Sequence, residues 1–371
     1  MIARLKELLF QNRSIKQTIA KNIFWLSIGE VASRFIRGII VIYAARILGA
    51  AEFGIFSYAL GLAGLFTIFS DMGIIMVLTR ELTQRPNDSK RYLATAFVIK
   101  ISLLISTSLA IAFLAPLFSL KTAIKLLPIM AALTFFDGIR DFSLGIFRAI
   151  EKMELQAFVT FFTNVAIVGS ALIALWYYGT STSLAITYVV GTGAGALVAM
   201  FILRKEYLAI WQNFDKTLIK KILGYSWPLF FMGMFSTFML NTDNVLLGYF
   251  KGEEYVGLYA AAQKIIQILY ILPAIIAIAI FPPISRLVAQ NEKEKIRSLI
   301  EKGLTMVFMI AIPITLGGII LAKPITFLLY KAEYLSSVST LQILLLTVLI
   351  IFPGTIIGNL GLAYNRQKDF D

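Results

Sequence analysis

The sequence predicts an all-α protein that crosses a membrane many times and is built from two bundles of helices. Hydrophobic residues make up 58% of the 371 residues and charged residues only 15%, and the mean hydropathy is +0.82. A soluble domain is about half apolar and about a quarter charged, so this composition is typical of a polytopic membrane protein. Apolar segments of about 20 residues, the length that spans a bilayer, recur along the chain. A short phrase repeated in both halves indicates that the halves are related.

Ten apolar segments are predicted to form membrane-spanning helices, because each contains a window long enough to cross the hydrocarbon layer. In chain order they are residues 19–48, 54–80, 92–118, 122–149, 154–178, 182–204, 223–250, 255–282, 302–322 and 337–364.

Two other segments are amphipathic, and we expect both to lie along the membrane surface. Basic and apolar residues alternate in residues 1–18, and the linker 205–222 has the same character. The linker separates a first bundle of six predicted helices, residues 19–204, from a second of four, residues 223–371. A cleavable signal peptide is not expected, because the first apolar segment is too long and carries charges.

An eight-residue phrase follows the first helix of each predicted bundle. Residues 49–56 read GAAEFGIF and residues 252–259 read GEEYVGLY. Both have the order glycine, four residues, glycine, aliphatic, aromatic, at an offset of 203 residues. Because six helices separate the copies, both halves should have the same orientation, which predicts a parallel repeat.

The distribution of basic residues predicts which helix ends face the cytoplasm. If the N-terminus is cytoplasmic, so are the loops at 80–92, 148–154, 204–222 and 283–302, where most Lys and Arg lie. The opposite loops hold Arg46, Lys121, Lys125, Lys251, Lys323 and Lys331. The positive-inside rule therefore predicts a multi-pass protein of the cytoplasmic membrane with a cytoplasmic N-terminus.

Residue types that the chain lacks exclude several kinds of chemistry. It has no Cys and no His, which removes thiolate nucleophiles, disulfides and His-ligated metal sites. It also has no Gly-x4-Gly-Lys-Ser/Thr phosphate loop and no long loop for a catalytic domain, so we expect no enzyme, cofactor or metal. The net charge of +13 falls in short loops, which indicates membrane lipids rather than nucleic acid as the partner.

Charged residues inside the apolar segments form the candidate site. A charge at bilayer depth costs at least about 2.5–3.5 kcal/mol and normally faces protein or water. Glu30, Arg34 and Arg37 share one face of the first helix at spacings of four and three. Glu30 and Arg34 can pair within the helix, which leaves Arg37 as a cation suited to a diphosphate. Anion binding and structural pairing are both open for this set.

Further charges interrupt the third, fourth and eighth helices. Asp137, Arg140 and Asp141 lie at spacings of three and four, so two carboxylates flank one guanidinium and favour a structural ion network. Lys100 and Lys264 each have two open interpretations. Either lysine contacts an anionic headgroup or pairs with an acid on another helix.

The remaining candidates are acids and amides. Asp71 lies at a depth similar to that of the first-helix arginines, so pairing with one of them is a structural interpretation. Asp243 lies within the polar run from Asn241 to Asn244 in an otherwise apolar helix. These oxygens could hold Na⁺, or the acid could take up a proton, or the run could simply line a polar cavity.

Several phrases together resemble a known family. They are residues 46–58 (RILGAAEFGIFSY), 69–74 (FSDMGI), 79–82 (TREL) and 146–153 (IFRAIEKM), with the second glycine phrase at 252–259. Their order and spacing are similar to the polysaccharide biosynthesis (oligosaccharide flippase) family within the multidrug/oligosaccharidyl-lipid/polysaccharide exporters. The likeness runs over nearly the whole chain and is clearest in residues 20–155.

The resemblance implies two bundles of about six helices that face a central cavity and translocate polyprenyl-diphosphate-linked sugars. Such a protein would act with membrane lipids, a lipid-linked oligosaccharide, and glycosyltransferases or a polymerase of the same pathway. The expected substrate-binding residues are Arg34, Arg37, Lys100, Arg140 and Lys264. Residues expected to couple ions or line the cavity are Glu30, Asp71, Asp137, Asp141, Asn241, Asp243 and Asn244. Since the family usually has 12 to 14 spans, the second bundle is expected to lack at least two helices.

Three other functions stay open. The nearest is a cation-coupled multidrug antiporter of the same superfamily, which should have more acids than cations at its centre. The central charges are balanced between acids and bases, so charge does not decide between the two. A membrane-embedded glycosyltransferase or polymerase would usually need a large outer loop. A non-transporting partner in an envelope assembly is the fourth possibility.

Overall fold

A computed structural model describes residues 15–273 and 292–363, together with residues 275, 276, 280, 283, 284, 287 and 290. All but the end of the predicted surface segment 1–18 lies outside the described residues. The chain forms two compact units: residues 1–40 and 47–257 make the first, and residues 41–46 and 258–371 the second. The predicted division at the linker 205–222 stays a prediction.

The first unit begins with two predicted helices that continue almost directly into one another. α2 (Ile15–Asp71) is 57 residues long and breaks at Gly49, whose φ of 77° and ψ of 171° are non-helical. The break falls between the predicted segments 19–48 and 54–80. A left-handed turn at Met72 and Gly73 then leads into α3 (Ile74–Gln84). Glycine suits both turns because it has no Cβ to clash at positive φ.

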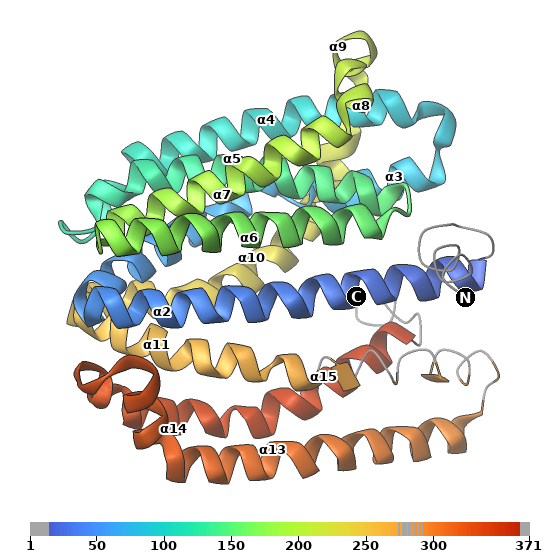
Figure 1. Ribbon diagram of the computed structural model, residues 1–371. Helices are drawn as coiled ribbons and strands as arrows, with labels where there is room; N and C mark the ends of the chain where they lie inside the picture. The colour runs from blue at the N-terminus through green and yellow to red at the C-terminus, as the bar shows by residue number, and fades with distance from the viewer. Residues whose placement is uncertain are drawn as a thin grey trace. The chain divides into compact units, whose positions relative to one another are not determined.

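Four helices of the first unit pack in sequence on one another (Figure 1). They are α4 (Ser89–Phe113), α5 (Leu127–Ala149), α6 (Met153–Tyr177) and α7 (Ser181–Ile202), with α5 and α6 both against α7 and α4 against α5. Close approach of α6 and α7 depends on small residues. A Cβ on Gly191 or Gly195 would overlap Ile167 or Thr163 of α6. This is the small-residue packing that membrane helices use when no hydrophobic force drives association.

Short helices and a long one complete the first unit. α8 (Arg204–Leu208) and α9 (Ile210–Asn213) lead to α10 (Thr217–Lys251), and α9 packs on α4. Asp215 fastens this connection, because its carboxylate accepts hydrogen bonds from the Thr217 hydroxyl (2.7 Å) and backbone N–H (2.9 Å) and binds Arg91. These contacts lower the pKa of Asp215 below its usual value, with those from Thr217 acting first. Two of the predicted cytoplasmic loops thus meet at one end of the unit.

The two copies of the repeated phrase contact each other inside the first unit. Gly49 and Gly252 both have positive φ, 77° and 91°. A Cβ on Gly54 would overlap the carbonyl oxygen of Glu253, and a Cβ on Gly257 would overlap that of Ala50. The contact is reciprocal. At the 203-residue offset Gly257 corresponds to Gly54 and Glu253 corresponds to Ala50, so the two contacts are equivalent. Such a two-fold relation fits the parallel repeat that the sequence predicts.

The second unit is held by α13 (Lys293–Tyr330), which packs on α14 (Val338–Leu346) and α15 (Val348–Ala363). α11 (Glu253–Leu269) enters this unit from residue 258 onward. Two tyrosines, at the end of α13 and just after it, join this region to other segments of the second unit through their hydroxyls. The Tyr330 hydroxyl donates to the carbonyl of Ala261 (3.0 Å), and the Tyr334 hydroxyl donates to that of Ala45 (2.9 Å). Buried phenols normally find such partners.

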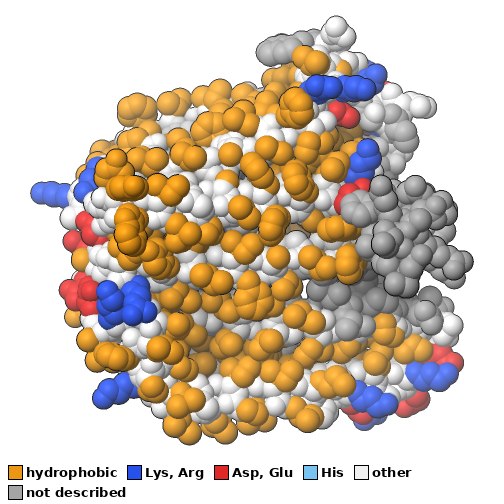
Figure 2. Space-filling view, viewed as in Figure 1, with side chains coloured by type: hydrophobic (Ala, Val, Ile, Leu, Met, Phe, Trp, Pro, Cys, Tyr) orange, Lys and Arg blue, Asp and Glu red, His pale blue; other side chains and the backbone are white. Residues whose placement is uncertain are grey.

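The described residues confirm the all-α membrane fold. They contain eight candidate membrane spans, of which the first, Phe24–Gln84, covers two predicted segments. The predicted segment at 122–149 is not among the eight, because the charges of α5 interrupt its apolar run. Figure 2 shows hydrophobic side chains along the helices and charged ones gathered toward their ends. Large apolar side chains such as Trp176 and Ile320 are each 78% exposed, which a bilayer accommodates and water does not.

Candidate functional site

Arg37 projects from α2 and is positioned by an amide on another helix. Its Nε donates to Oδ1 of Asn164 on α6 at 3.1 Å, and the Asn164 amide nitrogen donates to the carbonyl of Thr160 at 2.8 Å. Asn164 is buried, whereas Arg37 is exposed. The bond through Nε restricts the guanidinium, whose Nη1 and Nη2 fork is the part that can hold a carboxylate or phosphate in two parallel bonds.

Of the other two residues of the first-helix set, the structure describes the side chain of Arg34 but not that of Glu30. Arg34 lies one turn before Arg37 on α2 and is also exposed. The side chain of Glu30 lies outside the described residues, so the predicted pairing of Glu30 with Arg34 stays a prediction.

The predicted ion network on α5 is formed. Nη2 of Arg140 lies 2.7 Å from Oδ1 of Asp137 and 2.9 Å from Oδ1 of Asp141. The Arg140 side chain is 12% exposed and each carboxylate is 44% exposed. Two carboxylates therefore hold the buried guanidinium between them and remain accessible themselves. The local charge of this group is negative, as its spacing predicts.

Lys100 and Asp71 form an ion pair between α4 and α2. Nζ of Lys100 lies 2.8 Å from Oδ1 of Asp71, and the lysine is 1% exposed. Of the two interpretations open for Lys100, the structure matches pairing with an acid on another helix. Asp71 is expected from the sequence to pair with an arginine of the first helix, but it pairs with Lys100 of α4 instead. Lys100 reaches Asp71 because its flexible stem can cross a buried helix contact while its charge is neutralised.

These charges converge on Asp137. Its carboxylate interacts electrostatically with Arg140 and Asp141 of its own helix and with Arg37 and Lys100 of α2 and α4. Three helices of the first unit thus supply one group of charges, and a fourth, α6, positions Arg37 through the Asn164 amide. In the low dielectric of a membrane protein, such charges act on one another strongly.

A cavity of about 120 Å³ adjoins this group of charges. It lies between α2 and α5 and is lined by Leu60, Ala63, Gly64, Thr67, Ser70, Leu133, Thr134, Asp137 and Gly138. Hydroxyls and the Asp137 carboxylate make part of its wall polar. A hollow of this size is large enough to hold water. The first unit therefore contains a partly polar hollow beside the carboxylate of Asp137, where the group of charges meets its wall.

The polar run on α10 is divided between two faces. Asn241 and Asn244, three residues apart, pack against Gly64 and Gly61 of α2, where a Cβ would crowd them. The Asn241 amide also donates to the carbonyl of Thr237 at 2.9 Å. Asp243 is exposed. The two amides thus serve a close helix contact, and the coupling role of Asp243 stays a prediction.

Lys264 belongs to the second unit. Its Nζ donates to Oε1 of Gln267, one turn later on α11, at 2.9 Å, and the lysine is half-buried. This contact keeps the ammonium on a polar face of α11. Its predicted role in binding substrate stays a prediction.

Sequence reasoning missed Asn164, Thr67 and Thr134. Asn164 has a detectable signal, because an amide inside the apolar run of α6 needs a polar partner. The two threonines have none, because a threonine in a membrane helix commonly bonds its own backbone.

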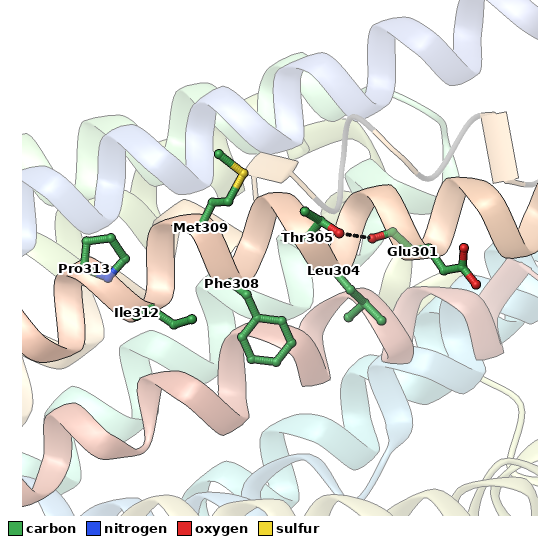
Figure 3. Close-up of a pocket in the computed structure, with 7 residues that line it drawn as sticks. All are labelled: Glu301, Leu304, Thr305, Phe308, Met309, Ile312 and Pro313. Carbon is green, nitrogen blue, oxygen red and sulfur yellow. Dashed lines mark hydrogen bonds between the residues drawn. The ribbon is translucent and has the colours of Figure 1, made fainter.

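A second hollow lies on the second unit and has a different character. It is a shallow groove of about 610 Å³ along α13, lined by Glu301, Leu304, Thr305, Phe308, Met309, Ile312 and Pro313 (Figure 3). The Thr305 hydroxyl donates a hydrogen bond to the backbone carbonyl of Glu301 at 2.7 Å, one turn earlier on α13. Beyond that turn the lining is apolar, so the groove suits hydrocarbon rather than a charged ligand.

Comparison with known proteins places the chain among transport proteins of membranes. The model of the "Polysaccharide biosynthesis protein" family matches residues 19–288, and the MatE model matches residues 228–369. A Shigella flexneri protein named "Putative O-antigen transporter" is 23% identical over 93% of this chain and 85% of its own length. The "Probable flippase AglR" of Haloferax volcanii is 25% identical, and the match covers 80% of this chain but 61% of AglR.

Solved structures share the fold. A multidrug resistance MATE family transporter in an inward-facing conformation has a TM-score of 0.69 at 15% identity, covering 99% of this chain and 85% of its own. The lipid II flippase MurJ in an inward closed conformation also has a TM-score of 0.69, at 18% identity over 91% of this chain and 76% of its own. At this identity the likeness concerns the fold. The family model, in contrast, matches well over half of the chain, and the protein therefore belongs to the polysaccharide biosynthesis protein family.

Proposed function

We propose that the protein is a flippase that moves a polyprenyl-diphosphate-linked oligosaccharide across the cytoplasmic membrane by alternating access. The observation that carries this proposal is the group of charges around the polar cavity of the first unit, in a chain of the polysaccharide biosynthesis family. A substrate with a diphosphate and sugars needs a polar path, and its hydrocarbon tail needs lipid. The hollow beside Asp137 supplies polar groups, and the membrane spans place lipid around the chain.

Arg37 is the residue proposed to bind the diphosphate. Asn164 fixes its Nε at 3.1 Å, which lowers the entropy lost when the guanidinium binds an anion. Arg34, one turn away on the same face, supplies a second positive charge. Arg140 and Lys100 are already neutralised by carboxylates, so they set the field around the site rather than hold the anion directly.

The exposed carboxylates are proposed to serve the transport cycle. Asp137 and Asp141 are each 44% exposed beside a cationic group, where they can bind a cation or interact with the sugars through hydrogen bonds. A cation gradient acting through these acids, or through Asp71 or Asp243, would supply energy. Rocking of helix bundles would then expose the site to each side of the membrane in turn.

The topology proposed for this cycle has a cytoplasmic N-terminus. The positive-inside rule supports it. The contact between Arg91 and Asp215 agrees with two of the predicted cytoplasmic loops lying on the same side of the membrane. Glycosyltransferases that assemble the lipid-linked sugar would work on the cytoplasmic side, and a polymerase or ligase on the other. No catalytic step by this chain is part of the proposal.

A cation-coupled multidrug antiporter is the second candidate function. The MatE family model, which matches residues 228–369, and the shared fold of a MATE family transporter favour it. The two functions differ in what the site must attract. An antiporter for cationic drugs depends on the acids, whereas the flippase depends on Arg37.

The test compares variants in proteoliposomes that contain a fluorescent lipid-linked oligosaccharide. Arg37→Gln is expected to reduce the flipping rate at least tenfold, because it removes the guanidinium fork but can keep a hydrogen bond to Asn164. The matched control is Arg148→Gln, which loses the same charge at the end of α5, where Arg148 binds Gln156. Normal flipping by Arg37→Gln would remove Arg37 from the site. Absence of flipping by the wild type, together with exchange of cationic drugs that persists in Arg37→Gln, would refute the flippase and favour the antiporter.

A further inference from the structure

A second group of cations lies at one end of the first unit, away from the cavity. We name it the tyrosine cluster and define it as Arg80, Glu81, Arg85, Tyr92, Lys221 and Tyr225. These residues come from α3, its C-terminal turn, the start of α4 and the start of α10, which pack on one another. The residues are distant in the chain, so their meeting is a product of the fold.

The two arginines are held by one buried acid. Nη2 of Arg80 lies 3.0 Å from Oε1 of Glu81, and Nε of Arg85 lies 3.1 Å from Oε2. The Glu81 side chain is 3% exposed, whereas the arginine side chains are 46% and 45% exposed. A buried carboxylate therefore fixes two guanidinium groups whose other donors face outward.

The third cation is fixed by the aromatic residues. Nζ of Lys221 donates to the hydroxyl of Tyr92 at 2.7 Å, and Tyr92 is 2% exposed. The ammonium lies 5.5 Å from the centre of the Tyr92 ring and 6.0 Å from that of Tyr225. Arg80 lies 4.8 Å above the Tyr225 ring and Arg85 lies 5.9 Å from that of Tyr92. Tyr225 thus holds Arg80 by cation–π attraction, and Tyr92 holds Lys221 through its hydroxyl.

The charge of the tyrosine cluster is unbalanced. Three cations face one carboxylate, and the nearby acids Asp88 and Asp215 bind Arg91 instead. A merely structural ion pair at the end of α3 would need one arginine. Flexible basic side chains that anchor a helix would extend into water separately rather than converge over two rings. The excess positive charge suits a phosphate group, whose oxygens guanidinium groups bind with two parallel hydrogen bonds.

We propose that the tyrosine cluster is a second anion site, which binds a phosphate-bearing group at the surface end of the first unit. This goes beyond the proposed function and does not depend on it. The group comes either from an anionic phospholipid headgroup, which is a singly charged phosphodiester, or from the more highly charged diphosphate of a polyprenyl diphosphate, since both present phosphate oxygens to the cations. Arg80, Arg85 and Lys221 bind it, and Glu81 with the two tyrosines keeps these cations in place.

The test measures the binding of inorganic diphosphate to the protein in phosphatidylcholine nanodiscs by calorimetry. Arg80→Gln and Lys221→Gln should each weaken binding about tenfold, which is about 1.4 kcal/mol. Arg80→Gln leaves Arg85 on Glu81, so the buried carboxylate keeps a partner and the fold is preserved. Arg204→Gln is the control, because Arg204 also stacks on a ring, that of Phe201, at 5.3 Å but has no place in the cluster.

Each measurement is repeated with Arg37→Gln as the starting protein, so that diphosphate bound near the cavity does not mask the result. The tenfold loss should appear in both proteins, whether or not Arg37 matters for flipping. Competition by phosphatidylglycerol in the nanodisc would assign the site to phospholipid headgroups. Stronger binding of farnesyl diphosphate, unaffected by phosphatidylglycerol, would assign it to polyprenyl diphosphates. Equal affinity in wild type and both Gln variants, or an equal loss in Arg204→Gln, would overturn the proposal.

Discussion

The contact between Gly54 and Gly257 should be among the places least tolerant of a methyl group. A Cβ on Gly54 would overlap the Glu253 carbonyl oxygen, whereas ordinary contact needs 3.4–4 Å. The two backbones would have to separate by an amount on the order of 1 Å, and overpacking of this kind costs about 3 kcal/mol at the upper end of its usual range. Alanine gains about 1 kcal/mol over glycine in a helix. Gly54→Ala should therefore lower the free energy of unfolding by about 2 kcal/mol.

The assay is denaturant unfolding in detergent, with Gly169→Ala as the matched control. Among the described residues, nothing outside the backbone of its own helix lies within 4 Å of a Cβ built on Gly169 of α6. That variant should therefore be as stable as wild type or more stable by about 1 kcal/mol. Gly257→Ala should behave like Gly54→Ala, because it meets Ala50 in the reciprocal way. The double variant should lose less than the sum, since the first substitution already separates the backbones. Equal stability of Gly54→Ala and Gly169→Ala would refute the reasoning.

Three further outcomes are expected. Lys100→Met should cost about 3 kcal/mol, the low end of the range for a broken buried pair, because the Asp71 carboxylate that it leaves behind is 30% exposed. Asp71→Asn in the same protein should restore much of the loss, as measured by thermal unfolding in detergent. Asp215 has a lowered pKa, so its contribution to stability is present above its unfolded pKa of about 3.9 and is lost as the pH falls below that value. Limited proteolysis after α9 should therefore become faster at acidic pH in wild type, and a rate independent of pH would contradict this. Cysteines placed in residues 85–90 and 251–254 should react with impermeant reagents from opposite sides of the membrane, and reaction from one side would overturn the topology.

The sequence predicts features that depend on composition and on local spacing. Apolar length indicates the spans, and the Arg140 network follows from spacings of three and four on one helix. The pairing of Lys100 with Asp71 cannot be predicted in this way, because the two residues lie on different helices and neither helix's sequence shows which residue of the other will be its neighbour. The repeat at Gly49 and Gly252 is visible in the sequence, but the contact between its copies depends on how two distant segments pack.

The same limit applies to the tyrosine cluster. Basic residues near 80–92 and 216–221 look like ordinary signals of topology, and each tyrosine alone like a residue of the membrane interface. Only the fold shows that Lys221 reaches a buried phenol and that both arginines share Glu81. Side chains that act together across helices are the part of the site that one sequence cannot reveal.

Residues 41–46 belong by their contacts to the second unit, although they lie within α2, which otherwise serves the first. The hydroxyl of Tyr334 is satisfied by the carbonyl of Ala45 from this stretch. If the gene is split at the linker and the fragments are produced separately, the C-terminal fragment carries a buried phenol whose acceptor is on the other polypeptide. Recovery of a working protein from such fragments would then require both in the same bilayer during folding, so expressing either fragment alone is a poor route to studying one unit.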